Sequence, residues 1–224
     1  MKVLAIDTTT DWLCLGLQVK EKFYAYQLKT GRNLSQLLVP SIARVTQALG
    51  LKISELDYFA CGLGPGSFTG MRIGLATIKG LAIVRNQPVV GVPSLDILAK
   101  NAPSDGRLIV AATDAKRSLI YCSAYRYEQG VLKRKTPYLL LSPEEFIKKF
   151  PRRALILGDA VALYRKVFLS RIKDVALLDQ DYWRLGAYNL MELALAKIKA
   201  RQLSSALTVK PIYLYPKECQ IKNK

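Results

Sequence analysis

The sequence predicts an α/β protein made of two related halves. Strand-like apolar runs alternate with longer stretches of helical spacing along the 224 residues, a pattern typical of sheets flanked by helices. Residues 3–7 and 108–114 each form an apolar run that ends in an acid and leads into a hairpin. The small, polar stretch 101–106 between them predicts a boundary. We therefore expect two domains, residues 1–105 and residues 106–224.

The first half predicts an antiparallel meander that is followed by helices and further strands. Runs rich in aromatic and branched residues predict strands at 3–6, 13–19 and 23–28. Apolar residues at helical spacing predict a helix over 33–49, which Gly50 ends. Beyond it we expect a helical turn at 54–56, a strand at 58–61, a helix over 67–84, a strand at 89–90 and a helix over 94–100.

The second half begins as the first does, with a strand, an acid and a hairpin. The same patterns predict strands at 108–112, 119–125 and 155–157, and helices over 143–150, from 160 onward and over 183–201. We expect residues 211–216 to be extended and residues 217–224 to be frayed.

The composition excludes several kinds of chemistry. The chain has no histidine, which removes the commonest metal ligand and the commonest general base. We expect no metal and no cofactor. The four cysteines are far apart and form no CxxC pair, as small buried apolar residues of a reducing cytoplasm would be: Cys14, Cys61, Cys122 and Cys219. No apolar run is long enough to span a membrane, so we expect a cytoplasmic protein without a membrane partner.

The net charge of +17 is unevenly distributed. Residues 1–106 hold 11 basic and 7 acidic residues, a balance of +4, whereas residues 107–224 hold 23 and 10, a balance of +13. A basic half is typical of a protein that lies close to RNA or to an acidic protein surface. A strongly charged solvated face is the alternative interpretation.

The glycine-rich run 62–74 fits neither of two common nucleotide-binding motifs. A P-loop needs a lysine and a hydroxyl directly after its last glycine, yet Met71 follows Gly70. With Gly64 and Gly66 in the first two places, the third glycine of a dinucleotide fingerprint falls on Thr69. Backbone amides at the start of the helix are still able to bind an anion.

Close packing is the interpretation that we favour for this run. Gly66, Gly70 and Gly74 recur every four residues and therefore lie on one face of the predicted helix. Each glycine costs about 0.5–1 kcal/mol relative to alanine inside a helix, so such a row indicates that a neighbouring backbone comes close. We expect a second protein to bind this face, while packing within the same chain remains the alternative. Arg72 and Lys79 lie away from the row.

Two turns carry an acid at matching places in the two halves. In the sugar-kinase, actin and Hsp70 superfamily, an aspartate in the first hairpin positions magnesium beside a phosphate-binding turn. This chain has Asp7, Thr8 and Thr9 but no glycine from Thr8 through Leu15, and we favour simple satisfaction of turn backbone groups over a vestigial nucleotide site. Asp114, beside Lys116 and Arg117, is equally compatible with a phosphate site and with a local salt bridge.

Several motifs together resemble the TsaB (YeaZ) family. They are the opening Leu4-Ala5-Ile6-Asp7-Thr8-Thr9, the run from Gly64 to Gly74 and the segment Gly91-Val92-Pro93-Ser94-Leu95. The turn at Asp114 with Tyr121, and the late Tyr213-Leu214, match more loosely. Where that family commonly has His-Ser-Glu at the start of the first long helix, this chain has Leu34-Ser35-Gln36.

The resemblance implies a two-lobed, actin-like (ribonuclease H-like) α/β fold with mixed sheets flanked by helices. It also implies a non-catalytic subunit that supports threonylcarbamoyl-adenosine modification of tRNA, binds the catalytic paralogue TsaD, recruits the ATPase TsaE and meets tRNA through the complex. A homodimer through the same face is a further expectation. The implied partner-binding residues are Leu37, Leu38, Gly66, Phe68, Gly70, Met71, Arg72, Gly74 and Lys79. Asp7, Thr8, Thr9 and Asp114 would form the vestigial nucleotide site.

The alternative function is enzymatic. A small-molecule kinase or ATPase of the same superfamily would use Asp7 to hold a magnesium-nucleotide complex. That hypothesis requires the isolated chain to bind a magnesium-nucleotide complex.

Overall fold

The structure is a computed structural model that describes residues 1–216. The expectations for Cys219 and for fraying of residues 217–224 lie outside the described residues. Contacts between Cα atoms divide the chain into two compact units. Among the described residues, the first unit combines Met1–Ile97 with Leu185–Pro211, and the second combines Leu98–Arg184 with residues 212–216.

This division differs from the expected domains 1–105 and 106–224. The first crossing lies between Ile97 and Leu98, before the polar stretch 101–106. The chain then returns to the first unit at Leu185, whose carbonyl oxygen accepts a hydrogen bond from Gln27 Nε2 at 2.9 Å. Sequence patterns predict helices and strands, but they do not predict which sheet an amphipathic helix packs against. The return of the chain to the first unit was therefore not predicted, although the helix itself was.

The sheet of the first unit is mixed, with the strand order β3-β2-β1-β4-β5. β1 pairs antiparallel with β2 and parallel with β4, and Ala5 is opposite both Gly16 and Ala60. β3 continues the sheet beyond β2 and β5 beyond β4. The strands are β1 Lys2–Asp7, β2 Trp12–Val19, β3 Lys22–Lys29, β4 Tyr58–Gly62 and β5 Val89–Val92.

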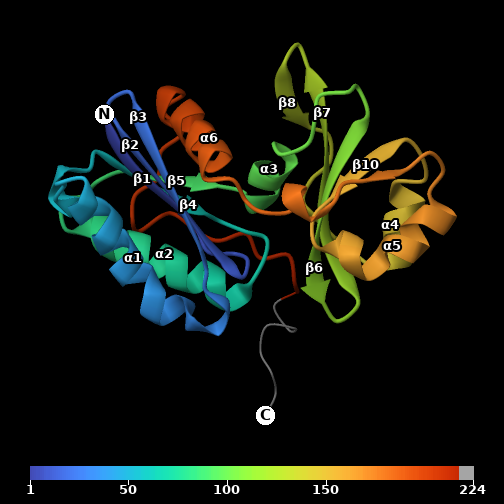
Figure 1. The fold of residues 1–224 in the computed structure, drawn as a ribbon, viewed down its shortest axis with the longest axis horizontal. Helices are drawn as coiled ribbons and strands as arrows, with labels where there is room; N and C mark the ends of the chain where they lie inside the picture. The colour runs from blue at the N-terminus through green and yellow to red at the C-terminus, as the bar shows by residue number, and fades with distance from the viewer. Residues whose placement is uncertain (217–224) are drawn as a thin grey trace. The chain divides into compact units, whose positions relative to one another are not determined.

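Helices cover both faces of this sheet. Figure 1 shows α1 (Leu34–Ala48) and α2 (Phe68–Ile83) against one face and α6 (Ala187–Lys199) against the other. Short helices lie at Gly31–Asn33 and at Ile53–Glu55, and α3 (Ser94–Ala99) comes directly after β5. The buried residues of α6 share one face of the helix, and this face packs against the sheet: Ala187, Leu190, Met191 and Ala194.

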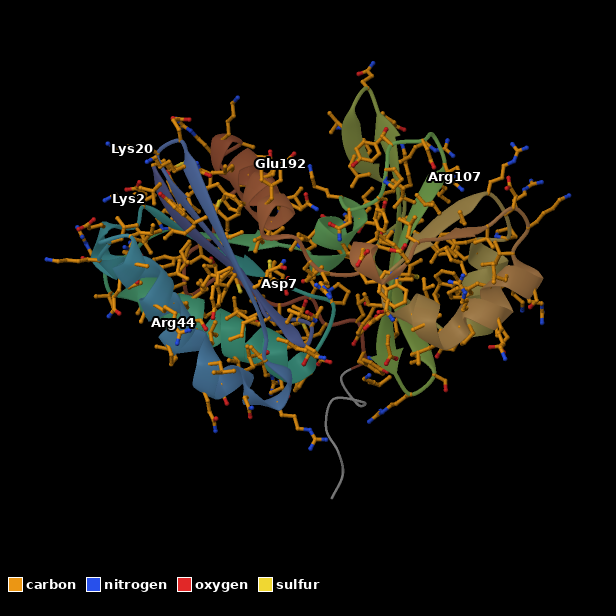
Figure 2. All side chains as sticks on the ribbon, in the orientation of Figure 1. Lys2, Asp7, Lys20, Arg44, Arg107 and Glu192 are labelled. Carbon is orange, nitrogen blue, oxygen red and sulfur yellow. The ribbon has the colours of Figure 1, made fainter. Side chains whose placement is uncertain are left out.

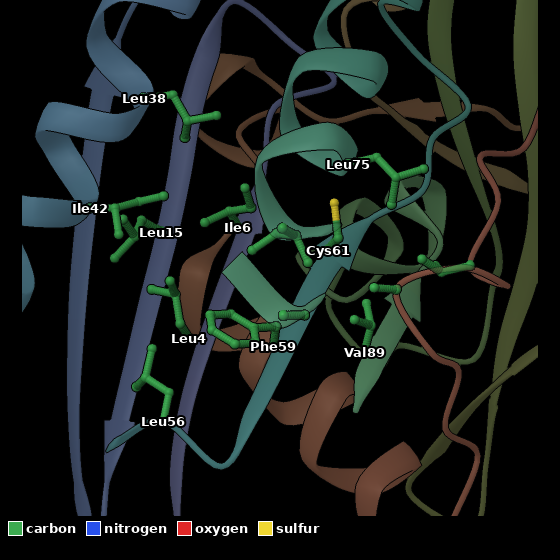
Figure 3. Close-up of a cluster of buried hydrophobic side chains, with 14 of the residues drawn as sticks. Leu4, Ile6, Leu15, Leu38, Ile42, Leu56, Phe59, Cys61, Leu75 and Val89 are labelled. Carbon is green, nitrogen blue, oxygen red and sulfur yellow. The ribbon is translucent and has the colours of Figure 1, made fainter. Parts of the chain in front are cut away.

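A continuous apolar cluster lies between the sheet and the pair α1 and α2. Figure 3 shows Leu4 and Ile6 of β1 beside Phe59 and Cys61 of β4, with Leu38 approaching from α1. Phe59 and Ile6 are completely buried. Burying side chains of this size stabilises the fold by about 1.5–3 kcal/mol each.

The second unit repeats the plan with a six-stranded mixed sheet, in the order β11-β10-β6-β7-β8 with β9 also paired to β7. Its strands are β6 Leu108–Lys116, β7 Leu119–Glu128, β8 Val131–Arg134, β9 Leu139–Leu141, β10 Ala154–Leu157 and β11 Ala176–Leu177. Figure 1 shows α4 (Pro143–Lys149) and α5 (Ala160–Arg171) together beside this sheet. A three-residue helix, Gln180–Tyr182, follows β11.

The core of the second unit contains three aromatic rings in contact, of which Phe146 is stacked on Phe168 and meets Phe150 edge to face. Phe146 of α4 lies 5.1 Å from Phe150 and 4.8 Å from Phe168 of α5, measured between ring centroids. Such pairs contribute about 0.5–1.5 kcal/mol beyond the area that they bury. A capping box between Ser142 and Glu145 fixes the start of α4.

The predicted fold class, α/β with two mixed sheets flanked by helices, is confirmed. The short strands β8, β9 and β11 were not predicted, because they are brief and β8 is rich in charge. None of the helices in residues 1–216 combines the length and the apolar character that crossing a bilayer requires.

Phe168→Ala is expected to lower the free energy of unfolding by about 3–5 kcal/mol, because the ring is completely buried. Leu163→Ala is the matched control on the same helix: its side chain is 59% exposed, and we expect a change within about 0.5 kcal/mol. Urea unfolding followed by circular dichroism measures both. Equal losses in the two variants would contradict this description of α5.

Candidate functional site

The turn after β1 packs directly against the start of α2. Thr8 Oγ1 donates a hydrogen bond to the carbonyl oxygen of Gly70 at 2.8 Å. The backbone amide of Ser67 donates to the carbonyl oxygen of Thr9, also at 2.8 Å. Thr8 and Thr9 are buried. Two segments far apart in the sequence therefore form one packed unit.

Glycine is required at the contact because any side chain would collide with the turn. A Cβ atom on Gly70 would lie 2.0 Å from the carbonyl oxygen of Thr8, and one on Gly74 would lie 2.1 Å from Thr8 Oγ1. On Gly66 it would lie 2.6 Å from the carbonyl oxygen of Thr9. Gly62, four residues earlier, belongs to the same set, since its Cβ would lie 1.9 Å from Asp7 Oδ2.

This geometry corrects the expectation that the glycine row faces a second protein. Gly70 and Gly74 are buried against the chain's own turn. Met71 is buried as well, at 2% exposure, and Leu38 at 1% belongs to the core of the first unit. The close approach inferred from the four-residue spacing is real, but the approaching backbone is that of Thr8 and Thr9. Packing within the same chain, the alternative interpretation, is the one that the structure supports.

Asp7 is fully buried, and both of its carboxylate oxygens accept hydrogen bonds. Oδ1 accepts from the backbone amide and the hydroxyl of Thr9, each at 2.7 Å. Oδ2 accepts from the hydroxyl of Ser94 at 2.6 Å. Ser94 Oγ in turn accepts from the amide of Gly64 at 3.1 Å. Figure 2 shows Asp7 inside the first unit, whereas Lys2, Lys20 and Arg44 lie at its periphery.

Burial raises the pKa of Asp7, and the hydrogen bonds from Ser94 and Thr9 oppose that rise. Burial also raises the pKa of the thiols of Cys14 and Cys61, and the nearby negative charge of Asp7 adds to the effect. A thiol with a raised pKa stays protonated near neutral pH and is a poor nucleophile. The polar centre of the first unit is therefore a structural junction with little capacity for covalent chemistry.

A magnesium-nucleotide complex would have to displace these bonds to reach Asp7. The carboxylate has no exposed surface, and Thr8 and Thr9 are committed to Gly70, Ser67 and Asp7. Ser67, whose amide was one candidate for anion binding, also caps α2 by accepting from the Gly70 amide at 3.1 Å. Within residues 1–216, no three His, Cys, Asp or Glu side chains come together as a metal site.

In the second unit, Asp114 makes a local salt bridge. Its Oδ1 accepts from the amide of Lys116 at 2.8 Å, and its Oδ2 lies 2.5 Å from Lys116 Nζ. The amide of Asp114 donates to Asp159 Oδ1 at 2.8 Å. Tyr215 donates from its hydroxyl to the carbonyl oxygen of Ala115 at 2.9 Å. Of the two interpretations left open, the structure supports the local salt bridge.

The outward face of α2 holds the remaining predicted partner-binding residues. Phe68 is 37% exposed, and the guanidinium of Arg72 lies 3.8 Å from the centre of its ring. Arg72 is exposed, while Lys79 is half-buried, as is Leu37 on α1. The sequence prediction did not name several other exposed small or apolar positions of this region: Val39 on α1, Ala76, Gly80 and Ile83 on α2, and Val84 directly after α2. For Ala76, Gly80 and Ile83 the available signal is helical periodicity, because these residues do not share the four-residue spacing of the buried glycine row.

Of the three glycines of α2, Gly80 alone has open space beside it. A Cβ atom built there meets nothing within 4 Å. Ala76, one turn earlier, is exposed too. The helix thus has an inner row of glycines against the Thr8 turn and an outer pair of small residues against solvent.

Comparison with known proteins places this chain in a family. The family model described as TsaD, tRNA N6-adenosine threonylcarbamoyltransferase, matches residues 28–207. The tRNA threonylcarbamoyladenosine biosynthesis protein TsaB of Bacillus subtilis (strain 168) is 30% identical over 171 residues, which cover 75% of each chain. The chain belongs to the TsaB family.

Other relatives agree with the assignment. TsaB of Haemophilus influenzae is 29% identical over 96% of this TsaB-family chain and 93% of its own, and TsaB of Escherichia coli (strain K12) is 31% identical over 64% of each. The solved structure of YeaZ from Pseudomonas aeruginosa superposes with a TM-score of 0.80 at 26% identity, covering 95% of this chain and 99% of that one. A second P. aeruginosa structure, described as similar to peptidase YEAZ, gives 0.82 at 26% identity, covering 96% and 99%.

Gly70→Ala is expected to lower the free energy of unfolding by about 1–3 kcal/mol, because the new methyl group meets the Thr8 carbonyl oxygen. Gly80→Ala on the same helix is the matched control. It meets no atom and should raise the free energy of unfolding by about 0.5–1 kcal/mol through helix propensity. Urea unfolding measures both, and a stabilised Gly70→Ala variant would refute the described contact.

The pH dependence of stability offers a second test of the junction. Because burial raises the pKa of Asp7, folding takes up a proton between the ordinary value of about 3.9 and the raised value. The stability that Asp7 contributes therefore falls as pH rises through that range. The free energy of unfolding of the native chain minus that of Asp7→Asn should decrease from about pH 4 upward, as urea titrations at several pH values would measure. A difference that grows with pH would show that the pKa is lowered.

Proposed function

We propose that this TsaB-family chain is a non-catalytic subunit that supports threonylcarbamoyl-adenosine modification of tRNA by binding a TsaD-like transferase. A TsaE-like ATPase would join the same cytoplasmic complex, and tRNA would be met through the complex. The family membership supports the pathway. The observation that carries the proposed role is the open, small-residue face of α2 around Gly80.

A glycine in the exposed middle of a helix costs about 0.5–1 kcal/mol relative to alanine. No contact within the described chain requires that glycine at position 80, because a Cβ atom there would meet nothing. A second helix that packs across Ala76 and Gly80 can approach closely, as interhelical packing distances depend on the side chains at the contact. We infer that the partner's helix lies on this face.

The residues around Gly80 suit a protein partner. Ile83 and Val84 are 57% and 81% exposed at one end of the face, and Phe68 is 37% exposed at the other. Clustered exposed apolar residues are typical of interaction sites. Arg72 and Lys79 flank the small residues and favour a partner with carboxylates nearby. In the absence of TsaD, a second copy of this chain would cover the same apolar residues, which supports a homodimer.

The buried members of the predicted set act indirectly in this proposal. Gly66, Gly70 and Gly74 fix α2 against the Thr8 turn, while Met71 and Leu38 hold it from within the core. The proposal thus keeps Leu37, Phe68, Arg72 and Lys79 as contact residues and adds the face around Gly80.

The polar chemistry of the chain supports a role without catalysis. The sequence contains no histidine, and the Asp7 carboxylate is enclosed by Thr9 and Ser94. The thiol of Cys122, like those of the first unit, is buried, and its pKa is raised to about 12. Proton transfer and nucleophilic attack commonly begin at a histidine, an accessible carboxylate or a reactive thiolate. This chain has no histidine, and the Asp7 carboxylate and these three thiols are buried.

Gly80→Leu is expected to abolish co-purification of the chain with TsaD, because the new side chain fills the space that the partner's helix would occupy. The variant should remain folded, with an unchanged or higher Tm, since position 80 has open space. Ala162→Leu is the matched control: it also enlarges an exposed small residue, but on α5 of the second unit. It should leave co-purification intact.

A Gly80→Leu variant that still binds TsaD with native stoichiometry would place the interface elsewhere. Loss of binding in both variants would show that helix surfaces are generally sensitive and would equally count against this face.

A further inference from the structure

Basic residues gather where the parallel strands of the second unit begin. β6 and β10 run parallel, with Leu108 opposite Ala154, so Arg107 and Arg153 precede neighbouring positions of the sheet. β11 continues the parallel set beyond β10. Just before these two strands, Arg152 and Lys173 form a parallel bridge. Figure 2 labels Arg107 at the start of β6.

The antiparallel strands β7 and β8 extend the same edge. Ile109 is opposite Tyr125, so Arg126 lies level with the first residue of β6. Lys133 of β8 is directly opposite Arg126. At this edge a basic residue thus lies within, or shortly before, each strand on the sheet's main path. We call this row the basic edge; it consists of Arg107, Arg126, Lys133, Arg152, Arg153 and Lys173.

Nearby acids neutralise only part of the row. Arg107 pairs with Asp105 at 2.5 Å, and Arg153 lies 3.8 Å from Asp174. Glu128, the acid of the β7–β8 hairpin, forms its ion pair with Lys135, while the charges of Lys133 and Arg126 contribute only a minor part of the lowering of its pKa. No carboxylate of residues 1–216 pairs with the other four members of the edge, all of which are exposed: Arg126, Lys133, Arg152 and Lys173.

The pairing register sets like charges against each other twice. Arg126 opposes Lys133, and Arg152 opposes Lys173. Like charges in directly opposed positions destabilise a sheet. Complementing a helix dipole explains basic residues in the last turns of α4 and α5, but it does not explain the basic edge, whose members lie in no helix. An anion from outside the chain would relieve the repulsion between these opposed cations, because it would be attracted to both members of each pair.

We propose that the basic edge binds the phosphate backbone of RNA. Neighbouring strands lie about 4.8 Å apart, so the row presents cations at successive intervals along a line, which suits a polymer of phosphates better than a single anion. Lysine and arginine contacts to phosphate position a nucleic acid without reading its bases, so we expect the contact to carry little base specificity. The choice of RNA among polyanions rests on the proposed function.

The test compares two fourfold variants of equal charge. The edge variant carries Arg126→Gln, Lys133→Gln, Arg152→Gln and Lys173→Gln. The control variant carries Lys20→Gln, Lys22→Gln, Lys29→Gln and Lys52→Gln, four exposed lysines of the first unit. Fluorescence anisotropy with labelled tRNA, over a series of NaCl concentrations, measures binding by the full-length chain. Because the edge variant removes two repulsive pairs, its Tm should stay level or rise.

The native chain is expected to bind tRNA with a marked salt dependence, and the edge variant to bind at least tenfold more weakly at 0.1 M NaCl. The slope of log K against log salt should become shallower by about one unit for each phosphate that the variant no longer neutralises. The control variant should lose much less affinity. Equal losses in the two variants, or no tRNA binding by the native chain, would overturn the proposal.

Two further measurements distinguish an RNA-binding edge from a membrane-binding edge and from the partner-binding face of α2. Unchanged tRNA binding by the edge variant, with lost binding to phosphatidylserine vesicles, would mean that the edge faces a membrane and would overturn the proposal. Co-purification with TsaD should be unaffected in the edge variant, because Gly80 and α2 lie in the first unit. Co-purification with TsaD therefore tests the partner-binding face, and tRNA binding tests the basic edge, so that either proposal can fail while the other stands.

Discussion

The close contact between the Thr8–Thr9 turn and the glycine face of α2 is the constraint on which the first unit depends. It joins the end of β1, the end of β4 and the start of α2 through backbone atoms rather than through long side chains. Asp7 adds a buried charge to the same point, held by Thr9 and Ser94. Because interiors are close-packed, a shift of this turn would move α2 and everything on its outer face.

This constraint gives the two faces of α2 opposite roles. On the inner face glycine is imposed by the fold, since Thr8 leaves no room for a Cβ atom. On the outer face nothing in the described chain imposes glycine at position 80. One face of α2 is therefore fixed to the Thr8 turn, and the other face is open to a partner. Because the inner face is fixed, the position of the outer face is fixed as well.

The sequence predicted most of the regular elements and the fold class, because the continuous apolar run of β1 and the helical spacing of apolar residues in α1 are clear signals. It also indicated that Gly66, Gly70 and Gly74 lie against a backbone. It could not say which backbone, since spacing along a helix carries no information about the neighbour in space. Ser94 was visible only as part of a family motif, because its partner Asp7 is distant in the sequence. The basic edge depends on strand register, which single runs of residues do not specify.

The return of the chain to the first unit has a consequence for its synthesis. The face of the first sheet that α6 covers stays bare until the ribosome has made Leu185–Pro211, after the whole of Leu98–Arg184. Domains commonly fold in order from the N-terminus as the chain emerges, but here the earlier unit must wait for the later one. During that interval the nascent chain exposes the apolar surface of the sheet that α6 later covers.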